Sequence, residues 1–193
     1  KAPVYDRKWK KKKLIKKKIN FKDLKKIKFE DAFFKILSSP NHSNKKWVTE
    51  QYDQMVMGDT IERSGTNAAV VKIHGKEKAV AVTVDSSANY CKSHPLSGGK
   101  QIVCESWRNL VAMGAKPVAI TNCLNFGNPE NPEIMGQFAE NILGIKEACE
   151  FLDYPVVSGN VSFYNETNAK SIFPTPVIGG IGLIDNLKNV INI

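Results

Sequence analysis

The sequence has few of the residues that ligate soft metals or cross-link a chain. Its four cysteines stand at least 13 residues apart without a Cys-x-x-Cys pair, and its three histidines are scattered. This spacing supports neither a zinc site nor a disulfide framework. No apolar run approaches the roughly 18 residues of a membrane helix, and no apolar signal core is recognisable. We therefore expect a cytoplasmic protein with free thiols and no membrane partner.

Positive charge is concentrated at one end of the sequence. Residues 1–28 hold 14 of the 28 Lys and Arg residues and two acidic residues, a net +12, so the remaining residues carry −3 of the total +9. We interpret this segment as a lysine-rich linker. The remaining chain is globular in composition, with 42% hydrophobic residues over the whole sequence. Because the sequence opens on Lys1 rather than Met, we also expect a piece of a longer polypeptide.

Hydrophobic periodicity organises the sequence into three parts. The linker, residues 1–28, is followed by a helical entry segment at 29–64 and a sheet domain at 65–193. In the entry segment, apolar spacing predicts a helix over 29–39 and a second helical piece over 47–57.

The sheet domain alternates strand-like and helix-like runs. Strands are expected at 68–74, 79–84, 118–120, 155–157 and 177–184, and helices at 101–113 and 132–152. Gly98 and Gly99 read as a turn, and Asn131 as the N-cap of the last helix. The alternation predicts an α/β or mixed α+β fold in which a mixed sheet packs against helices.

Residues 156–167 form the segment richest in groups that bind phosphate or a hard cation. A β-branched entry runs into Ser158, Gly159 and Asn160, followed by Ser162. We expect a tight turn here, because glycine allows close approach of backbone amides to an anion, and Asn and Ser offer neutral oxygens. The alternative is an ordinary strand-to-loop turn in which Asn and Ser bond their own backbone.

Other strings stand in a fixed order around this segment. They are Ala2–Arg7, Gln51–Asp53, Gly98–Gln101, Gly114–Pro117, Asn122–Glu130, Tyr164–Thr167 and Phe173–Gly179. Over nearly the whole chain, this order resembles phosphoribosylformylglycinamidine synthase of purine biosynthesis. The resemblance implies the second of two sheet domains, each of the N-terminal type found in aminoimidazole ribonucleotide synthetase-like proteins, which pair through their strands into a shared β-barrel.

The resemblance also implies an activity and partners. Such an enzyme is a ligase that uses ATP and Mg²⁺ to activate the amide oxygen of formylglycinamide ribonucleotide, and glutamine-derived ammonia then displaces phosphate to give formylglycinamidine ribonucleotide. The fragment alone is expected to be inactive. It would need the missing N-terminal half and a glutaminase subunit or domain, and by itself it would form a homodimer that mimics the pairing of the halves.

The resemblance assigns four site residues by position. Asn122 and Gly159 would contact ATP, Asn160 would ligate Mg²⁺, and Ser162 would contact the nucleotide substrate. No catalytic residue is assigned. The family pattern has Asp at the position of Asn122, and usually also at that of Asn67, so two negative charges are missing.

Three further residues have open interpretations. Asp85 ends a strand where related domains place a metal carboxylate, although an ordinary loop Asp fits equally well. Asn109, five positions before Gly114-Ala115-Lys116-Pro117, resembles an Asp-x4-Gly-Ala-x-Pro signature with Asn for Asp. His94 lacks the family's catalytic histidine context and is expected to be a loop residue.

Three alternative functions are compatible with the sequence. In the first alternative, the domain belongs to another ATP-dependent enzyme of the superfamily, such as aminoimidazole ribonucleotide synthetase. In the second, it is a structural module that holds an auxiliary nucleotide or supports a catalytic half. In the third, residues 1–28 bind a polyanion. Because Trp9 is the only stacking group in the lysine run, we expect no nucleic-acid partner.

Overall fold

The computed structural model describes residues 2–13, 22, 26–52, 54–63 and 65–191. Its contacts divide the chain into two compact units, one formed by Lys1–Leu14 with Met55–Ile193 and the other by Ile15–Gln54. Much of the predicted lysine-rich linker, including Lys16–Lys18, lies outside the described residues.

The smaller unit contains the short helices α2 (Phe29–Leu37), η1 (Pro40–His42) and α3 (Lys46–Thr49). The predicted helix at 29–39 is confirmed over most of its length, and its phenylalanines Phe29 and Phe33 stack with ring centroids 5.8 Å apart. The second piece, predicted over 47–57, is only partly right. It consists of α3 and, within the larger unit, the single turn η2 (Val56–Gly58).

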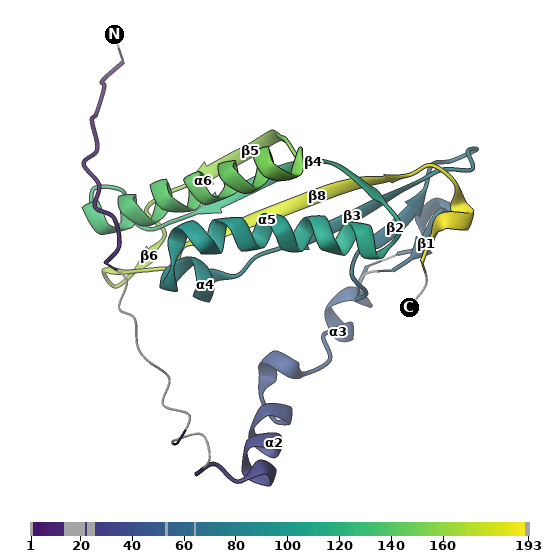
Figure 1. Cartoon of the computed structure of the whole chain (residues 1–193), viewed down its shortest axis with the longest axis horizontal. Helices are drawn as coiled ribbons and strands as arrows, with labels where there is room; N and C mark the ends of the chain where they lie inside the picture. Colours follow the sequence, from purple (N-terminus) through teal and green to yellow (C-terminus); the bar gives the residue numbers. More distant parts are fainter. Residues whose placement is uncertain (1, 14–21, 23–25, 53, 64, 192–193) are drawn as a thin grey trace. The chain divides into compact units, whose positions relative to one another are not determined.

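The larger unit is built on a six-stranded sheet with the order β1-β2-β3-β8-β4-β5 (Figure 1). The strands are β1 (Thr60–Glu62), β2 (Ala69–Lys72), β3 (Ala79–Asp85), β8 (Thr175–Ile184), β4 (Lys116–Asn125) and β5 (Val156–Ser162). Only β4 and β5 pair in parallel, and the other neighbours are antiparallel. The predicted mixed sheet is therefore confirmed. A small hairpin, β6 (Glu166–Thr167) and β7 (Lys170–Ser171), follows β5.

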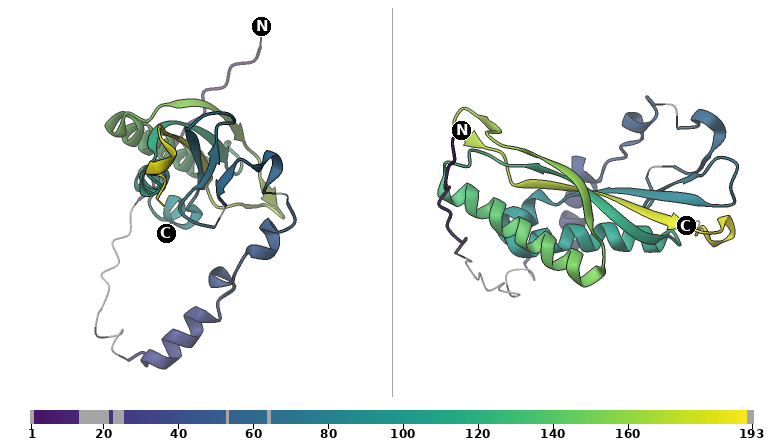
Figure 2. Two further views of the ribbon diagram at one scale, coloured as in Figure 1. Left: turned by 90° about the vertical axis from the view of Figure 1, so that its right-hand side faces the viewer. Right: turned by 90° about the horizontal axis from the view of Figure 1, so that it is seen from above.

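Helices α4 (Ala88–Ser93), α5 (Pro95–Ala112) and α6 (Pro132–Leu152) lie against one face of this sheet, and η3 (Leu187–Asn189) follows β8 (Figure 2). Helix α5 contacts β3, β4 and β8, and α6 packs beside α5. Helix α6 has the predicted bounds. It begins after Asn131, whose side chain accepts a hydrogen bond from the backbone N–H of Glu133 at 2.9 Å.

The turn predicted at Gly98 and Gly99 is wrong, because both glycines lie inside α5. A side chain at Gly98 would meet the backbone of Cys91 in α4 at 2.6 Å, and one at Gly99 would collide with the carbonyl oxygen of Asn141 in α6. The two glycines therefore let three helices approach closely rather than reverse the chain.

The two faces of the sheet differ in burial. The face under the helices carries the core, including Val70, Ala81, Ile120, Ile178 and Ile184. The opposite face, which we call the open face, leaves apolar side chains exposed: Val71, Val82, Val84 and Ile181. Within the part of the chain that the structure describes, no helix is long and apolar enough to cross a membrane.

Candidate nucleotide site

The segment Ser158–Ser162 belongs to strand β5, so the tight turn predicted there is wrong. Its backbone pairs with β4 residue by residue up to Asn125↔Ser162. Gly159 does not have a positive φ, unlike Gly58, Gly65 and Gly75. Glycine at this position must therefore serve a purpose other than an unusual backbone conformation.

That purpose is space for a neighbouring side chain. Asn122 on β4 pairs with Gly159 on β5. A β-carbon added to Gly159 would collide with the side-chain oxygen of Asn122 and would lie 2.8 Å from its backbone oxygen. The two residues predicted to contact ATP are thus direct neighbours, and the amide of Asn122 covers the glycine on the helix side of the sheet.

A pocket of about 270 Å³ opens beside Asn122, between β4, the start of β5 and helix α6. Its other lining residues are Leu124, Ile142, Ile145, Lys146, Cys149, Glu150 and Val156. The lining is largely apolar, with the amide of Asn122 as a group that both donates and accepts hydrogen bonds. Such a pocket suits a flat, apolar group with a polar edge.

Asn160 and Ser162 lie on the opposite face, because side chains alternate along a strand. The register pairs Cys123 with Asn160 and Asn125 with Ser162. Ser162 is anchored: its hydroxyl lies 3.1 Å from the amide nitrogen of Asn165, which also donates to the carbonyl oxygen of Ser162 at 3.0 Å.

Ser158 on β5 and Thr121 on β4 lie beside Asn160 and Ser162 on the open face, and together these side chains form a polar row. The hydroxyl of Ser158 donates to that of Thr121 at 2.7 Å, so its donor is already used. Among the described residues, the side chain of Asn160 has no hydrogen-bond partner, and it is exposed. Asn160 is therefore the member of the row whose amide oxygen is available to a ligand.

The four predicted residues are brought together along two paired strands but on two sides of the sheet. Asn122 and Gly159 lie on the helix side, and Asn160 and Ser162 on the open face. Since β5 is an edge strand, one ligand that wraps around this edge can contact both faces of the sheet. Thr121 and Asn125 share this region without having been selected from the sequence. Side chains alternate along β4, so pairing β4 with a strand that extends to Ser162 places Thr121 and Asn125 on the same face as Asn160 and Ser162. This alternation is the sequence signal for the two residues.

The donor set determines which metal fits this region. No group of three or more His, Cys, Asp or Glu side chains able to hold a metal occurs among the residues that the structure describes. Mg²⁺ keeps several waters and is bound through few protein oxygens together with substrate phosphates. A single amide oxygen from Asn160 fits such an ion, and does not fit a metal held by protein ligands alone.

A second polar groove of about 570 Å³ lies along the C-terminal half of β3, between residues 65–69 and helix α5. It is lined in part by Asn67, Asp85, Glu105 and Asn109, so three residues that the sequence singled out separately are neighbours in space. Asp85 is 8% exposed and accepts hydrogen bonds from Thr83 at 2.6 Å and from Asn109 at 2.7 Å.

Burial raises the pKa of Asp85, against the lowering effect of these two hydrogen bonds and of Arg108. It also raises the pKa of Glu105, with a further contribution from the charge of Asp85. The groove therefore holds carboxyl groups that resist ionisation. Asn122 is not among its lining residues, which separates this groove from the β4–β5 region. His94 has a local role, because its Nδ1 accepts a hydrogen bond from the backbone N–H of Ser97 at the start of α5.

The comparison with protein families decides the assignment of the fold. Residues 65–184 match the model of "AIR synthase related protein, N-terminal domain". The chain belongs to this family. The AIR synthase related domain thus covers every strand from β2 to β8, including the paired strands of the candidate site.

Curated proteins similar to the chain are longer than it is. The phosphoribosylformylglycinamidine synthase subunit PurL of Pelagibacter ubique is 59% identical over 191 residues, covering 98% of this chain and 26% of that protein. The subunit of Bartonella quintana is 49% identical over 194 residues, with 100% and 26% covered. The resemblance to this synthase is confirmed, and the chain spans about a quarter of the length of these relatives.

Solved structures similar to the AIR synthase related domain give the same assignment. The PurLQS complex of Thermotoga maritima matches with a TM-score of 0.71 and 37% identity, covering 78% of this chain and 25% of that one. PurL of the same organism complexed with ATP matches with a TM-score of 0.67 and 38% identity, covering 77% and 24%. The predicted fold, a mixed sheet packed against helices, is therefore confirmed.

Proposed function

We propose that this chain supplies one wall of the Mg²⁺–ATP and ribonucleotide site of a phosphoribosylformylglycinamidine synthase. The observation that carries the proposal is the parallel register of β4 and β5, which brings Asn122 to Gly159 and leaves Asn160 and Ser162 one and three residues beyond Gly159 along the same edge. The similarity to PurL subunits supports the reaction, and the structures of PurL complexed with ATP and with FGAR support the two ligands.

In this proposal the two sides of the sheet have different tasks. The pocket beside Asn122 takes the base of ATP, because its lining is largely apolar and the Asn122 amide can bond a ring edge. The open face takes the phosphates, where Asn160 ligates Mg²⁺ and Ser162 bonds the nucleotide substrate. Mg²⁺ would neutralise charge on the transferred phosphoryl group. The nucleotide would follow the edge of β5 from one side to the other.

The chain by itself would not complete the reaction. Activation of the amide oxygen of formylglycinamide ribonucleotide and displacement of phosphate by glutamine-derived ammonia need an ammonia source, and we propose that a glutaminase subunit or domain and the preceding half of the same enzyme supply what is missing. The open face of the sheet would pair with that half. Alone, we expect the chain to self-associate through this face, because its valines are exposed.

Calorimetric titration with Mg²⁺–ADP tests the site directly. We expect saturable binding to the wild-type chain, and its loss in Asn160→Ala. Ser158→Ala is the matched control. The hydroxyl of Ser158 already donates to Thr121, so its removal should leave the binding heat unchanged. Binding that persists in Asn160→Ala would refute the metal role of this residue, and heat lost equally in both variants would indicate a damaged strand.

A second candidate, a structural or auxiliary-nucleotide domain, is favoured by the neutral residues Asn67 and Asn122 where the family pattern has acids. Turnover separates the two candidates. In the intact enzyme, Asn160→Ala should lower the rate of formylglycinamidine ribonucleotide formation by about 100-fold if the residue holds the reacting phosphates. Unchanged turnover would favour the structural candidate.

A further inference from the structure

The structure describes residues 2–13 of the lysine-rich segment that precedes the sheet domain. Residues 5–13, which we call the strap, run over the first turns of α6 in the same compact unit. The backbone N–H of Lys10 donates to the carbonyl oxygen of Pro132 at 3.0 Å, and that of Lys12 donates to the Glu140 carboxylate at 3.1 Å. The strap is therefore held by its backbone, which leaves most of its side chains uncommitted.

Helix α6 is shaped to receive the strap. A β-carbon on Gly136 would collide with the carbonyl oxygen of Lys10, so glycine at this position permits the contact. At one end Arg7 pairs with Glu130 at 3.4 Å, and Glu130 also accepts a hydrogen bond from the Tyr164 hydroxyl at 3.2 Å. These contacts place four consecutive lysines along a fixed line.

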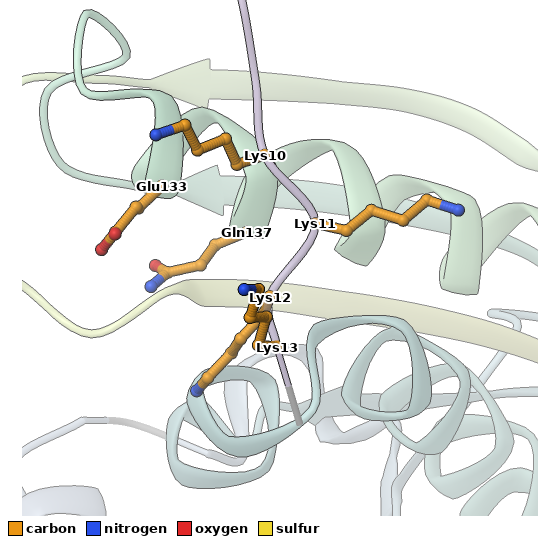
Figure 3. Close-up of a pocket in the computed structure, with 6 residues that line it drawn as sticks. All are labelled: Lys10, Lys11, Lys12, Lys13, Glu133 and Gln137. Atoms are coloured by element: carbon orange, nitrogen blue, oxygen red, sulfur yellow. The ribbon is translucent and has the colours of Figure 1, made fainter. Parts of the chain in front are cut away.

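A groove of about 470 Å³ lies between the strap and the helix, lined by Lys10, Lys11, Lys12, Lys13, Glu133 and Gln137. Figure 3 shows Lys10, Lys12 and Lys13 on the side of Glu133 and Gln137, and Lys11 directed to the other side. The ammonium of Lys12 donates to the carbonyl oxygen of Lys92. Among the described residues, Lys10, Lys11 and Lys13 have no ion-pair partner, so the groove carries an excess of positive charge.

We propose that this groove binds a linked chain of phosphates, such as the polyphosphate group of a nucleotide. Lysine presents a compact charge with three donors, which suits phosphate oxygens. The four lysines and one glutamate of the lining give the groove a formal net charge of +3 (four positive charges less one negative). That exceeds the charge of about −2 on a single phosphate group and fits a chain of linked phosphates. The Gln137 amide offers a further donor, and Glu133 is the one carboxylate among the described residues that line the groove.

A nucleic-acid strand fits the groove less well. Single-stranded binding needs aromatic platforms for successive bases. In the strap, Arg7 lies over the ring of Tyr5 at 5.1 Å from its centroid, which leaves Trp9 as the one other aromatic group. The groove offers lysine ammonium groups but no row of aromatic rings on which bases could stack. This favours a ligand that is mainly phosphate.

Titration of the chain with inorganic tripolyphosphate, at low and at physiological salt, tests the proposal. We expect saturable binding that weakens with salt, and at least a tenfold loss of affinity in Lys10→Gln/Lys11→Gln/Lys13→Gln. A matched triple variant on the smaller unit, Lys35→Gln/Lys45→Gln/Lys46→Gln, loses the same net charge and should keep the affinity. Circular dichroism checks that both variants fold.

Two further measurements separate this groove from the proposed ATP site. Asn160→Ala should leave tripolyphosphate binding unchanged, and the strap variant should keep the Asn160-dependent heat with Mg²⁺–ADP. Equal loss of tripolyphosphate affinity in both lysine variants would overturn the proposal, since it would show a general charge effect. Binding of a single-stranded oligonucleotide without binding of tripolyphosphate would also overturn it, in favour of a nucleic-acid surface.

Discussion

The side chain of Asn122 occupies the space that a side chain at Gly159 would fill. This relationship joins two strands that are separated in sequence by the whole of α6, and it fixes what each position tolerates. Asn122 can turn its amide toward the neighbouring pocket only while residue 159 has no β-carbon. The pair is thus a single steric unit, although the resemblance assigns each residue its own contact to ATP.

Substitution of Gly159 by alanine should therefore damage the edge of the sheet. The new methyl group would be too close to the side-chain and backbone oxygens of Asn122. We expect a loss of about 1–3 kcal/mol in the free energy of unfolding, measured by urea denaturation. Asn122→Ala/Gly159→Ala should recover part of this loss, because only the side-chain collision is relieved. A Gly159→Ala variant as stable as wild type would contradict this steric account.

Adjacent glycines on β8 offer a matched pair in the core. A methyl group on Gly180 would collide with the hydroxyls of Ser106 and Tyr154 on the helix side, whereas one on Gly179 would meet only a methyl of Thr121 at 2.9 Å on the open face. We expect Gly180→Ala to lower the free energy of unfolding by about 1–3 kcal/mol, and Gly179→Ala by less. Thermal melting of both variants in parallel gives the comparison. A larger loss of stability in Gly179→Ala than in Gly180→Ala would contradict this account, because it would show that the core accommodates an added methyl group more easily than the open face does.

The buried carboxyl of Asp85 should make stability depend on pH in a defined direction. Burial raises its pKa in the folded chain. A group of this kind stabilises the fold fully below its unfolded pKa, and that contribution is lost as pH rises through the folded pKa. The stability of Asp85→Asn relative to wild type should therefore rise as the pH increases above the unfolded carboxyl pKa of about 4, measured by urea denaturation at each pH.

The exposed Asp185, which pairs with Lys78 at 3.0 Å, provides the control for this experiment. Asp185→Asn removes the same charge without removing a buried carboxyl, so it should not reproduce the pH-dependent gain. If the two variants share one pH profile, the effect belongs to net charge rather than to burial of Asp85.

Some elements followed directly from the sequence because local signals and tertiary packing agree. Helix α6 has a capping Asn131, a proline at its first position and an apolar stripe, and the structure gives it the predicted bounds. The sequence predicts a strand at 155–157 and a turn from Ser158 to Asn160, because Ser, Gly and Asn are turn formers, but pairing with β4 outweighs that preference and continues β5 to Ser162. That pairing is a long-range contact, because α6 separates the two strands in the sequence, and the residues around Gly159 do not reveal it.

The glycines of α5 illustrate the same limit. Gly98 and Gly99 would end an isolated helix, but here they admit α4 and α6. The site residues were selected by resemblance, and their division between the two faces depends on a register that the sequence alone did not reveal. Asn67, Asp85 and Asn109 are far apart in the sequence and line one groove only because the fold brings residues 65–69, β3 and α5 together.

Self-association through the open face makes a further prediction. Val84 is 73% exposed on this face. We expect Val84→Glu to shift the chain toward monomer in sedimentation velocity, because a charge in an apolar contact is costly to bury. Phe151→Glu on helix α6, where the side chain is 87% exposed, is the control and should not change the distribution. Equal behaviour of both variants would remove the open face as the contact.

The thiols should react in an order set by burial. Burial raises the pKa of the Cys91 thiol to about 12 and that of Cys149 to about 11. Because the thiolate is the reactive form, we expect an alkylating reagent to modify the half-buried Cys104 and Cys123 first in the native chain. Mass spectrometry of peptides over time measures the order, and labelling in urea is the control. Early modification of Cys91 would contradict the packing of α4 against α5.

All four proposed ligand contacts lie within residues 122–162, in one strand–helix–strand segment whose last strand forms the sheet edge. An edge strand is held by hydrogen bonds on one side only, so it can open locally without unfolding the other five strands. Occupancy of the site would then be coupled to closure of this edge, and a bound nucleotide would slow hydrogen exchange in β5 far more than in β3 or β8. Recognition and local folding would be one equilibrium at this edge.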